Sequence, residues 1–515
     1  MRIIKTHETD LSTLSNFERD MAYNGLDCCV THDVFAATHP QLDHHTERTY
    51  AFSRALQGPV LEMRIRGVLV DMVRRASVVD EICDEIDWVE SRLNQLVLDG
   101  VGMSEFNWRS NAHLQALFYG ELGISPINKQ GRPTTDRGAR EKLEGNPLAT
   151  QLIRHINALT ELGDKLSVLR TEIDSDGRIR TSYNIAGTST GRFSSSLSEF
   201  GTGGNLQNIE ESLRSIFIAD PGYKFCKLDA KSGESFCVGA IEWNLFRDGT
   251  YLDACESTDL HTTAAKACWP DLQWTGDPKS DRAIADRPFY RHHSYRQCTK
   301  KVGHASNYAG KTPTIAEQTG IPLNVVAEFQ PKYFMAFPAH QRWQAAVDEQ
   351  LRRVGYLITL TGRKRWFFGR RSDPSVLREA IAYDPQGSLA DIVNLAMLKL
   401  WRMNIAVVMM QDHDAITFMY KESDEDRIIP QLMANLVVPI TLAEGRTLSI
   451  PYDAETGWNK GHYCCGDKTR KGCEKCERSI NLDGLKPYHG SDARRRQPIP
   501  SLIDTIVTKK LAGVR

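Results

Sequence analysis

The sequence predicts a mixed α+β protein in which a discontinuous β core is interrupted by two helical insertions. Three patterns support this prediction. Strand-like and loop-like patterns fill residues 178–242, helical patterns return over residues 258–350, and strand patterns resume at residue 356. Long amphipathic helical patterns precede the first of these regions. The β core is therefore expected to be assembled from stretches that are distant in the chain.

The N-terminal part begins with helices. Four apolar residues recur at helical spacing within residues 16–37, namely Phe17, Met21, Leu26 and Val30. After a predicted turn and short strand at residues 67–71, Asp71 is a candidate N-cap for a long helix over residues 72–100. The apolar stripe of this helix consists of Ile82, Ile86, Val89, Leu93 and Val97.

Three more helices and two strand regions complete the prediction. Ser110 or Asn111 can cap a helix that carries Leu114, Leu117 and Phe118. Another long helix is predicted near residues 149–170. In the C-terminal half, strands at 356–368 and 405–420 are expected on either side of a helix over 386–403.

Composition and charge place the chain among ordinary globular proteins. Its 515 residues are 41% hydrophobic and 25% charged, and its length allows ~3–4 domain-sized units. The net charge of −1 does not by itself indicate a polyanion binder. Basic residues nevertheless cluster at 282–301 and 363–378, which favours one cleft that faces a polyanion. A solvated basic face is the alternative interpretation.

The sequence also bears on location. No apolar run approaches the ~20 residues of a membrane span, and the N-terminus has no signal-peptide pattern. Most of the twelve cysteines are scattered along the chain, which is typical of buried thiols in a reducing compartment. We therefore expect a protein without membrane attachment in the cytoplasm, or in the host cytoplasm if the chain is viral.

Two aspartates stand at the ends of predicted strands in the separate strand regions. Asp229 closes the segment 222–229, and Asp414 follows the apolar run 407–410. Carboxylates from two distant strands suit a pair of Mg²⁺ ions, which lie ~3.5–4 Å apart and stabilise the attacking and leaving oxygens of a phosphoryl transfer. Asp412 competes with Asp414 for this role, but strand alternation is expected to turn it to the opposite face. Two turn aspartates that never meet are the alternative.

A stretch rich in hydroxyls and amides lies before the first aspartate. Thr188–Ser196 includes Arg192, and it is followed by Asn205-Leu206-Gln207-Asn208. Such side chains contact the phosphates and base edges of nucleic acids. A Ser/Gly-rich surface loop would explain the serines, but it explains the amides less well.

A predicted helix between the two aspartates carries Arg296, Lys300, His304 and Tyr308. Their spacing of four places them along one helix face. Cations at one end can bind a triphosphate, and the aromatic side chain at the other end can stack on a base. An amphipathic helix with a basic solvent face is the alternative.

Taken in order, these segments resemble the family A DNA polymerases, the bacterial DNA polymerase I type, over roughly residues 50–460. The resemblance implies a right-hand polymerase fold with an antiparallel β palm, helical fingers and a helical thumb. The implied division is 1–50 as a remnant of an exonuclease-like domain, 51–177 as thumb and its connection to the palm, 178–257 and 351–460 as palm, 258–350 as fingers, and 461–515 as a Cys-rich basic extension.

The resemblance also implies roles for single residues. Asp229 and Asp414 would hold two Mg²⁺ ions, with the backbone carbonyl of Ala230 as a further ligand. Lys300 would be the general acid for the leaving group, and Glu234 would exclude a 2′-hydroxyl. Other implied nucleotide-binding residues are His261, Arg296, His304 and Tyr308, and the implied DNA-binding residues are Arg192, Asn205, Gln207, Asn208, Gln386 and His413.

The chain departs from the family pattern at several positions. Ala415 follows Asp414 where the family usually has glutamate, and His304 replaces a phenylalanine or tyrosine. Ala309 stands where glycine is usual, and Ala382 stands where asparagine is frequent. None of these departures removes an expected metal ligand. Together they indicate a divergent, phage-like branch.

The N-terminal helix suggests which partners to expect. Tyr23 and Asp27 resemble the last motif of the family's 3′–5′ exonuclease domain, but no earlier segment would supply the other carboxylates. We therefore expect no proofreading by this chain alone, and a separate exonuclease chain or processivity factor is a candidate partner. Primer–template DNA and dNTPs are the other expected partners, and a monomer is expected.

Four cysteines cluster near the C-terminus. Cys473 and Cys476 have zinc-knuckle spacing, and Cys464 and Cys465 can complete a set of four ligands. A structural Zn²⁺ and free surface thiols are equally supported by this pattern.

Two functions from other classes stay open. A single-subunit RNA polymerase would share the two aspartates and the basic helix, although Glu234 and the Asn-Leu-Gln-Asn segment argue against it. A non-catalytic DNA-binding accessory would leave both aspartates and Lys300 without a role. Primer extension with dNTPs and with NTPs separates these possibilities.

Overall fold

The computed structural model describes residues 10–290, 293–370, 373–465 and 480–490. The chain divides into two compact units. The unit that we call the sheet unit comprises residues 58–231, 393–439 and 449–515, and the helical unit comprises residues 1–57, 232–392 and 440–448. Two long helices, α2 (His44–Arg66) and α16 (Pro374–Met403), have residues in both units.

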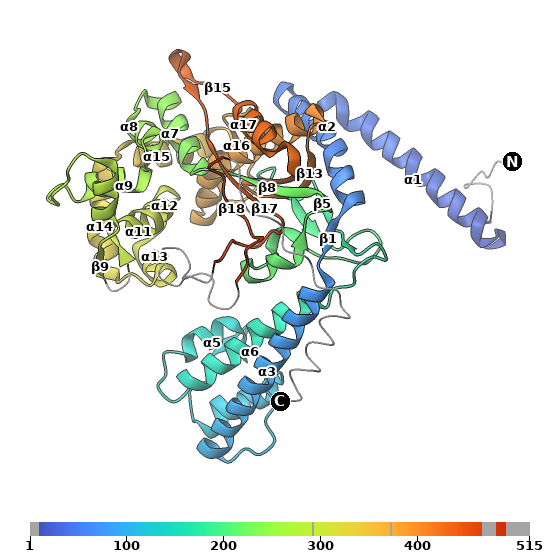
Figure 1. Cartoon of the computed structure of the whole chain (residues 1–515), viewed down its shortest axis with the longest axis vertical. Helices are drawn as coiled ribbons and strands as arrows, with labels where there is room; N and C mark the ends of the chain where they lie inside the picture. The colour runs from blue at the N-terminus through green and yellow to red at the C-terminus, as the bar shows by residue number, and fades with distance from the viewer. Residues whose placement is uncertain (1–9, 291–292, 371–372, 466–479, 491–515) are drawn as a thin grey trace. The chain divides into compact units, whose positions relative to one another are not determined.

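An antiparallel five-stranded sheet forms the centre of the sheet unit, as the sequence predicted (Figure 1). In spatial order its strands are β13 (Val407–Asp412), β14 (Ala415–Lys421), β8 (Tyr223–Ala230), β17 (Tyr452–Gly457) and β18 (Lys486–Pro487). The central strand β8 pairs Asp229 with Ala415 on one side and with Asp453 on the other. The two predicted strand regions therefore meet at β8.

Two long helices of the sheet unit pack side by side, α3 (Met72–Val101) and α6 (Thr150–Leu169) (Figure 1). All five residues of the predicted apolar stripe on α3 are buried. Burial of each such side chain contributes about 1.5–3 kcal/mol, so this stripe fixes the helix pair. Asp71 caps α3 as predicted, because its side chain accepts a hydrogen bond from the Arg74 backbone N–H.

Shorter elements complete the sheet unit. They are β1 (Val68–Val70), α4 (Asn111–Gln115), β2 (Asn128–Lys129), β3 (Arg132–Pro133), α5 (Arg137–Leu143), β4 (Arg178–Ile179), β5 (Ser182–Asn184), β6 (Ser194–Ser196), β7 (Phe217–Ile218) and α17 (Glu425–Leu436). Of the two predicted cap candidates, Ser110 and Asn111, the structure has Ser110 as the cap of α4.

The helical unit contains the long helix α1 (Asn16–Thr38) and a series of shorter helices. The shorter helices are α7 (Gly233–Phe246), α8 (Thr250–Glu256), α9 (Leu260–Cys268), α10 (Pro278–Ala285), α11 (Tyr295–Cys298), α12 (His304–Asn307), α13 (Thr312–Thr319), α14 (Leu323–Ala336) and α15 (Ala339–Arg353). Its strands are β9 (Pro288–Tyr290), β10 (His293–Ser294), β11 (Tyr356–Ile358), β12 (Lys364–Trp366), β15 (Ile440–Thr441) and β16 (Thr447–Leu448).

Two predicted boundaries were wrong. Helix α7 occupies residues that were assigned to strands and loops before residue 242, because its residues 235–242 are all buried and give no amphipathic period. Helix α16 begins at Pro374 instead of residue 386 and continues through Pro385. A proline inside a helix removes one backbone hydrogen bond, but the buried side chains around it, such as Tyr383 and Leu389, stabilise the helix by packing.

Candidate active site

The turn between β13 and β14 brings Asp414 to the end of β8. Asp412 closes β13 and Ala415 opens β14, so the turn consists of His413 and Asp414. His413 has a φ of 58°, and the Asp414 N–H donates to the Asp412 carbonyl over 2.7 Å. The Ala230 N–H donates to the Asp414 carbonyl oxygen over 3.0 Å. The backbone therefore places Asp414 beside Asp229 and Ala230, as the sequence predicted.

The electrostatics of the two aspartates suit a cation. Burial raises the pKa of Asp414, and the neighbouring charge of Asp229 raises it further. The positive charges of Lys227 and Arg192 act in the opposite direction and lower the pKa of Asp414. Asp229 and Asp414 repel each other, and their carboxylate oxygens and the Ala230 carbonyl oxygen are all hard donors. Mg²⁺ prefers such donors and retains several waters, so this small set fits the ion. In the described residues no group of three or more His, Cys, Asp or Glu side chains is arranged around a metal position.

Asp412 differs from Asp414 because it has an ion-pair partner of its own, Lys460, and not because of strand alternation. The Lys460 Nζ lies 2.6 Å from Asp412 Oδ2, and the side chains are only 4% and 16% exposed, respectively. Residues two apart share a face in a continuous strand, so the alternation argument was wrong. The turn at His413 separates the two side chains instead. The charge of Asp412 is thus used in a buried ion pair.

An amide network supports the same turn. The Asn205 side chain accepts hydrogen bonds from the N–H groups of Gln207 and Asn208, and so caps a short 3₁₀ helix. Gln207 donates to both the backbone and side-chain oxygens of Gln411, each over 3.0 Å, and Gln411 donates to the His413 carbonyl over 3.0 Å. The sequence did not single out Gln411, because a lone glutamine in a strand gives no signal.

In the helical unit, Glu234 accepts a hydrogen bond from the Tyr308 hydroxyl over 2.6 Å. The His304 Nε2 lies 3.8 Å from the same carboxylate, and the rings of His304 and Tyr308 meet edge to face. Burial raises the pKa of Tyr308, and the negative charge of Glu234 raises it further. Three predicted nucleotide-binding residues therefore form one polar cluster.

The predicted basic helix is not one regular helix. A π-helical stretch over Thr299–Gly303 separates α11 from α12, and Tyr308 follows the end of α12. The extra residue in a π turn changes the angular positions along the helix, so a spacing of four no longer keeps one face. Arg296 and Tyr308 consequently have different surroundings.

Arg296 is held by a carboxylate. Its Nε and Nη2 donate to Asp259 over 2.7 and 2.9 Å, and Asp259 also caps α9. His261 lies next to this pair. Its burial lowers its pKa, and the positive charge of Arg296 lowers it further, to about 4. His261 is therefore neutral at pH 7. Lys300, in contrast, is exposed. This leaves its ammonium group accessible to a phosphate.

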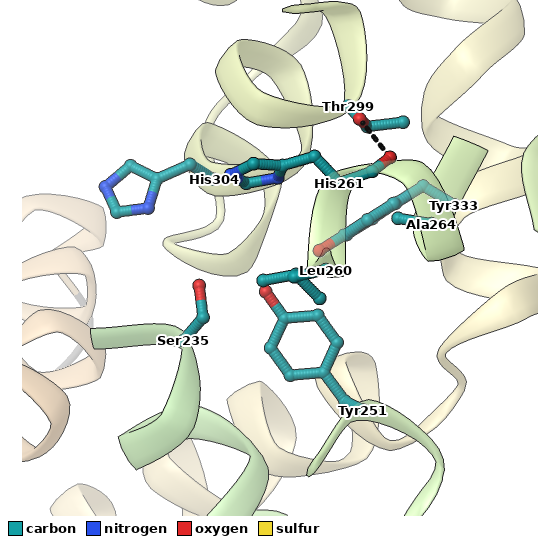
Figure 2. Close-up of a pocket in the computed structure, with 8 residues that line it drawn as sticks. All are labelled: Ser235, Tyr251, Leu260, His261, Ala264, Thr299, His304 and Tyr333. Carbon is teal, nitrogen blue, oxygen red and sulfur yellow. Dashed lines mark hydrogen bonds between the residues drawn. The ribbon is translucent and has the colours of Figure 1, made fainter. Parts of the chain in front are cut away.

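A small cavity lies beside His261 and His304 (Figure 2). Its lining residues are Ser235, Tyr251, Leu260, His261, Ala264, Thr299, His304 and Tyr333. Its volume of about 10 Å³ is close to that needed for a single water molecule. Figure 2 shows the hydroxyl groups of Ser235, Tyr251 and Tyr333 turned toward one another, and Thr299 donates to the His261 carbonyl over 3.0 Å.

A buried hydrogen-bond chain continues from this cavity into the helical unit. Tyr333 donates to Asn307 over 2.9 Å, and Asn307 donates to the Tyr251 hydroxyl over 3.0 Å. His340 contacts the Tyr333 hydroxyl on one side and Glu242 on the other. This chain links α7, α8, α12, α14 and α15. No sequence pattern indicates this chain of hydrogen bonds, because it joins residues as distant as Glu242 and His340.

The remaining predicted residues are distributed as follows. Arg192 is half-buried in the sheet unit, Asn208 is exposed there, and Gln386 is half-buried on α16. Cys464 is buried and Cys465 is half-buried, whereas Cys473 and Cys476 lie outside the described residues. The zinc site therefore stays a prediction. Over the described part of the chain, no helix is long and apolar enough to cross a bilayer.

Known proteins resemble this chain over most of its length. The family model for DNA polymerase family A matches residues 77–462. The thermostable DNA polymerase I of Thermus filiformis is 27% identical over 428 residues, which cover 78% of this chain and 47% of that protein. DNA polymerase I of Rhizobium leguminosarum is 24% identical over 484 residues, which cover 87% of this chain and 44% of that protein. The chain thus spans about half the length of the curated relatives it matches.

One solved structure shows the same fold. It is the POL domain of Pol1 from M. smegmatis in complex with DNA primer-template and dNTP. Its TM-score is 0.61 at 22% sequence identity, and the match covers 79% of this chain and 69% of that chain.

Proposed function

Because the chain belongs to DNA polymerase family A, we propose that it is a template-directed DNA polymerase that adds dNTPs to a primer 3′-hydroxyl. The observation that carries this proposal is the register of β8 and β14, which pairs Asp229 with Ala415 and so sets Asp414 beside it. The chain spans about half of its curated relatives, so the activity proposed here is that of the matched polymerase region.

The sheet unit would hold the metal ions. Asp229 and Asp414 would each offer carboxylate oxygens, and Ala230 would add its backbone carbonyl. Bound Mg²⁺ supplies activation of the primer 3′-hydroxyl and neutralises charge on the pyrophosphate. The Gln207–Gln411 network would hold the turn that carries Asp414, and Arg192, Asn208 and His413 would contact the DNA.

The helical unit would bind the incoming nucleotide. The exposed ammonium group of Lys300 would bind the triphosphate and donate a proton to the leaving pyrophosphate. Glu234, fixed by Tyr308, would occupy the space that a ribonucleotide 2′-hydroxyl requires. Neutral His261 would donate or accept a hydrogen bond instead of supplying a full charge. Asp259 would orient the Arg296 side chain for its contact with the nucleotide.

The separate exonuclease or processivity partner stays a prediction from the sequence. In the structure, α1 buries none of its residues, and Tyr23 is 66% exposed. An accessible helix of this kind is compatible with a partner. Degradation of a 3′-end by the purified chain in the presence of Mg²⁺ would contradict the expectation that proofreading is absent.

Primer extension tests the proposed activity. A labelled primer on a DNA template is incubated with the full chain, Mg²⁺ and either dNTPs or NTPs. We expect template-directed extension with dNTPs and strong discrimination against NTPs. Equal extension with NTPs would favour the RNA polymerase alternative, and tight DNA binding without any extension would favour a non-catalytic accessory.

Glu234→Ala is the matched specificity variant. Because removal of the carboxylate opens the space beside the sugar, the ratio of dNTP to NTP incorporation is expected to fall by at least about tenfold, or ~1.4 kcal/mol. An unchanged ratio would contradict the role of Glu234.

A further inference from the structure

A basic side chain lies directly beside the carboxylate that we assign to metal binding. Lys227 precedes Asp229 by two residues on β8, so both side chains project from one face of the sheet. The Lys227 Nζ lies 2.9 Å from Asp229 Oδ2. The two side chains are 20% and 40% exposed, so water screens this ion pair only in part.

A second carboxylate faces Lys227 from the neighbouring strand. The register of β8 and β17 pairs Lys227 with Glu455 and Asp229 with Asp453. Directly opposed residues in an antiparallel pair have Cβ atoms ~4.5–5.5 Å apart, which a lysine side chain spans easily. Burial lowers the pKa of Lys227, but the charge of Asp229 and then that of Glu455 raise it above its ordinary value. Burial raises the pKa of Glu455, and the charge of Lys227 opposes this shift. Glu455 is therefore within reach of the same ammonium group as a second acceptor.

We propose that Lys227 is an internal counter-ion of the metal site. Its ammonium group neutralises Asp229 while no divalent cation is bound, and it moves to Glu455 when a cation binds. This inference rests on the proposed role of Asp229 as a metal ligand. The ammonium group and a divalent cation compete for the same carboxylate oxygens, because each is attracted by the same negative charge. The ion pair therefore weakens cation binding to the free chain.

This competition has a consequence for the order of binding. With Lys227 in place, Asp229, Asp414 and the ammonium group together carry one net negative charge. Mg²⁺ in phosphoryl-transfer sites is usually held by one or two carboxylates together with substrate phosphates. The phosphates of a nucleotide would add the negative charge that the free site lacks. We therefore expect the site to fill with metal mainly when nucleotide is present.

Titration of the full chain with Mn²⁺ in the absence of DNA and nucleotide tests this role. Electron paramagnetic resonance of free Mn²⁺ measures the affinity directly. Lys227→Met is expected to bind Mn²⁺ at least about tenfold more tightly than the wild type, because the competing charge is gone. Lys227→Arg keeps the charge and is expected to stay within about twofold of the wild type.

Three further variants complete the test. Lys421→Met removes an exposed lysine at the far end of β14 and is expected to leave Mn²⁺ affinity unchanged. Glu455→Gln removes the proposed second acceptor, so it is expected to weaken Mn²⁺ binding severalfold in the wild type. The same change is expected to have little effect in Lys227→Met. Lys227→Gln is a second charge-removing variant, and circular dichroism checks that each protein is folded.

The outcomes separate this inference from the proposed function. If Asp229→Asn abolishes Mn²⁺ binding but both charge-removing Lys227 variants bind no more tightly than the wild type, the counter-ion role is wrong and the metal site stands. If Asp229→Asn binds Mn²⁺ as the wild type does, the metal site itself is contradicted, and the counter-ion role is lost with it.

Discussion

Ala309 holds a left-handed backbone conformation that ordinarily favours glycine. The sequence marked it as an alanine where the resembled family usually has glycine. The structure gives it a φ of 54°, directly after Tyr308. An L-residue in this left-handed region carries a cost of roughly 1–2 kcal/mol. The backbone after Tyr308 thus has a conformation that suits glycine, although the residue there is alanine.

Ala309→Gly is therefore expected to stabilise the protein. The relief of steric strain is partly offset by the greater entropy of glycine in the unfolded chain, so a gain of about 0.5–1 kcal/mol is expected. Urea denaturation measures this change. Ala327→Gly, on an exposed position inside α14, is the control and is expected to lose about 1 kcal/mol. A loss of stability in Ala309→Gly would contradict the account of its backbone.

His261 makes a prediction about pH. Its folded pKa of about 4 lies below the ordinary value of 6.5, so the unfolded chain binds the proton more readily. The stability linked to His261 is complete above pH 6.5 and is lost as the pH falls toward 4. Between pH 7 and pH 5 the expected loss is about 2 kcal/mol. The measurement is the difference in unfolding free energy between the wild type and His261→Gln, and a difference that does not vary with pH would contradict it.

At the scale of elements, the sequence predicted what depends on local periodicity and capping. The stripe on α3 and the caps Asp71 and Ser110 are of this kind. The prediction from the sequence failed where tertiary contacts determine the secondary structure. Residues 235–242 of α7 are all buried and show no amphipathic period, Pro385 lies inside α16, and a π-helical stretch divides α11 from α12.

The buried pair of Asp412 and Lys460 links the end of β13 to the segment after β17. Asp412→Asn would leave the Lys460 charge buried without its counter-charge, and a loss of about 3 kcal/mol is expected. Asp414→Asn, two residues away, is the matched control. It is expected to cost little stability, because it removes a carboxylate that Asp229 repels. Thermal unfolding measures both, and equal effects of the two changes would contradict the distinction between these aspartates.

At the scale of the whole molecule, the prediction of fold and family from the sequence is confirmed. The ordered motifs indicated a right-hand polymerase fold with an antiparallel palm, and the family match and the similar solved structure agree. The predicted domain boundaries, the exonuclease-like remnant and the zinc site stay predictions.

The site itself was predicted only in part. Asp229, Asp414 and the Asn-Leu-Gln-Asn segment were visible because they belong to local motifs. The pairs Arg296–Asp259, Lys460–Asp412 and His340–Glu242 were not visible, because each joins residues at least 37 positions apart. Such contacts depend on the folded chain and leave no pattern of spacing in the sequence.

We propose that Asp229 and Asp414 together form the catalytic carboxylate pair of a DNA polymerase. Single-turnover primer extension with saturating dNTP and Mg²⁺ tests it most directly, with DNA affinity measured in parallel. Asp229→Asn and Asp414→Asn are each expected to slow extension by at least ~10³-fold, or ~4 kcal/mol, while DNA binding is retained. Asp453→Asn, opposite Asp229 on β17, is the charge control and is expected to slow extension by less than about tenfold. Extension at the wild-type rate by either Asp229→Asn or Asp414→Asn would contradict the claim.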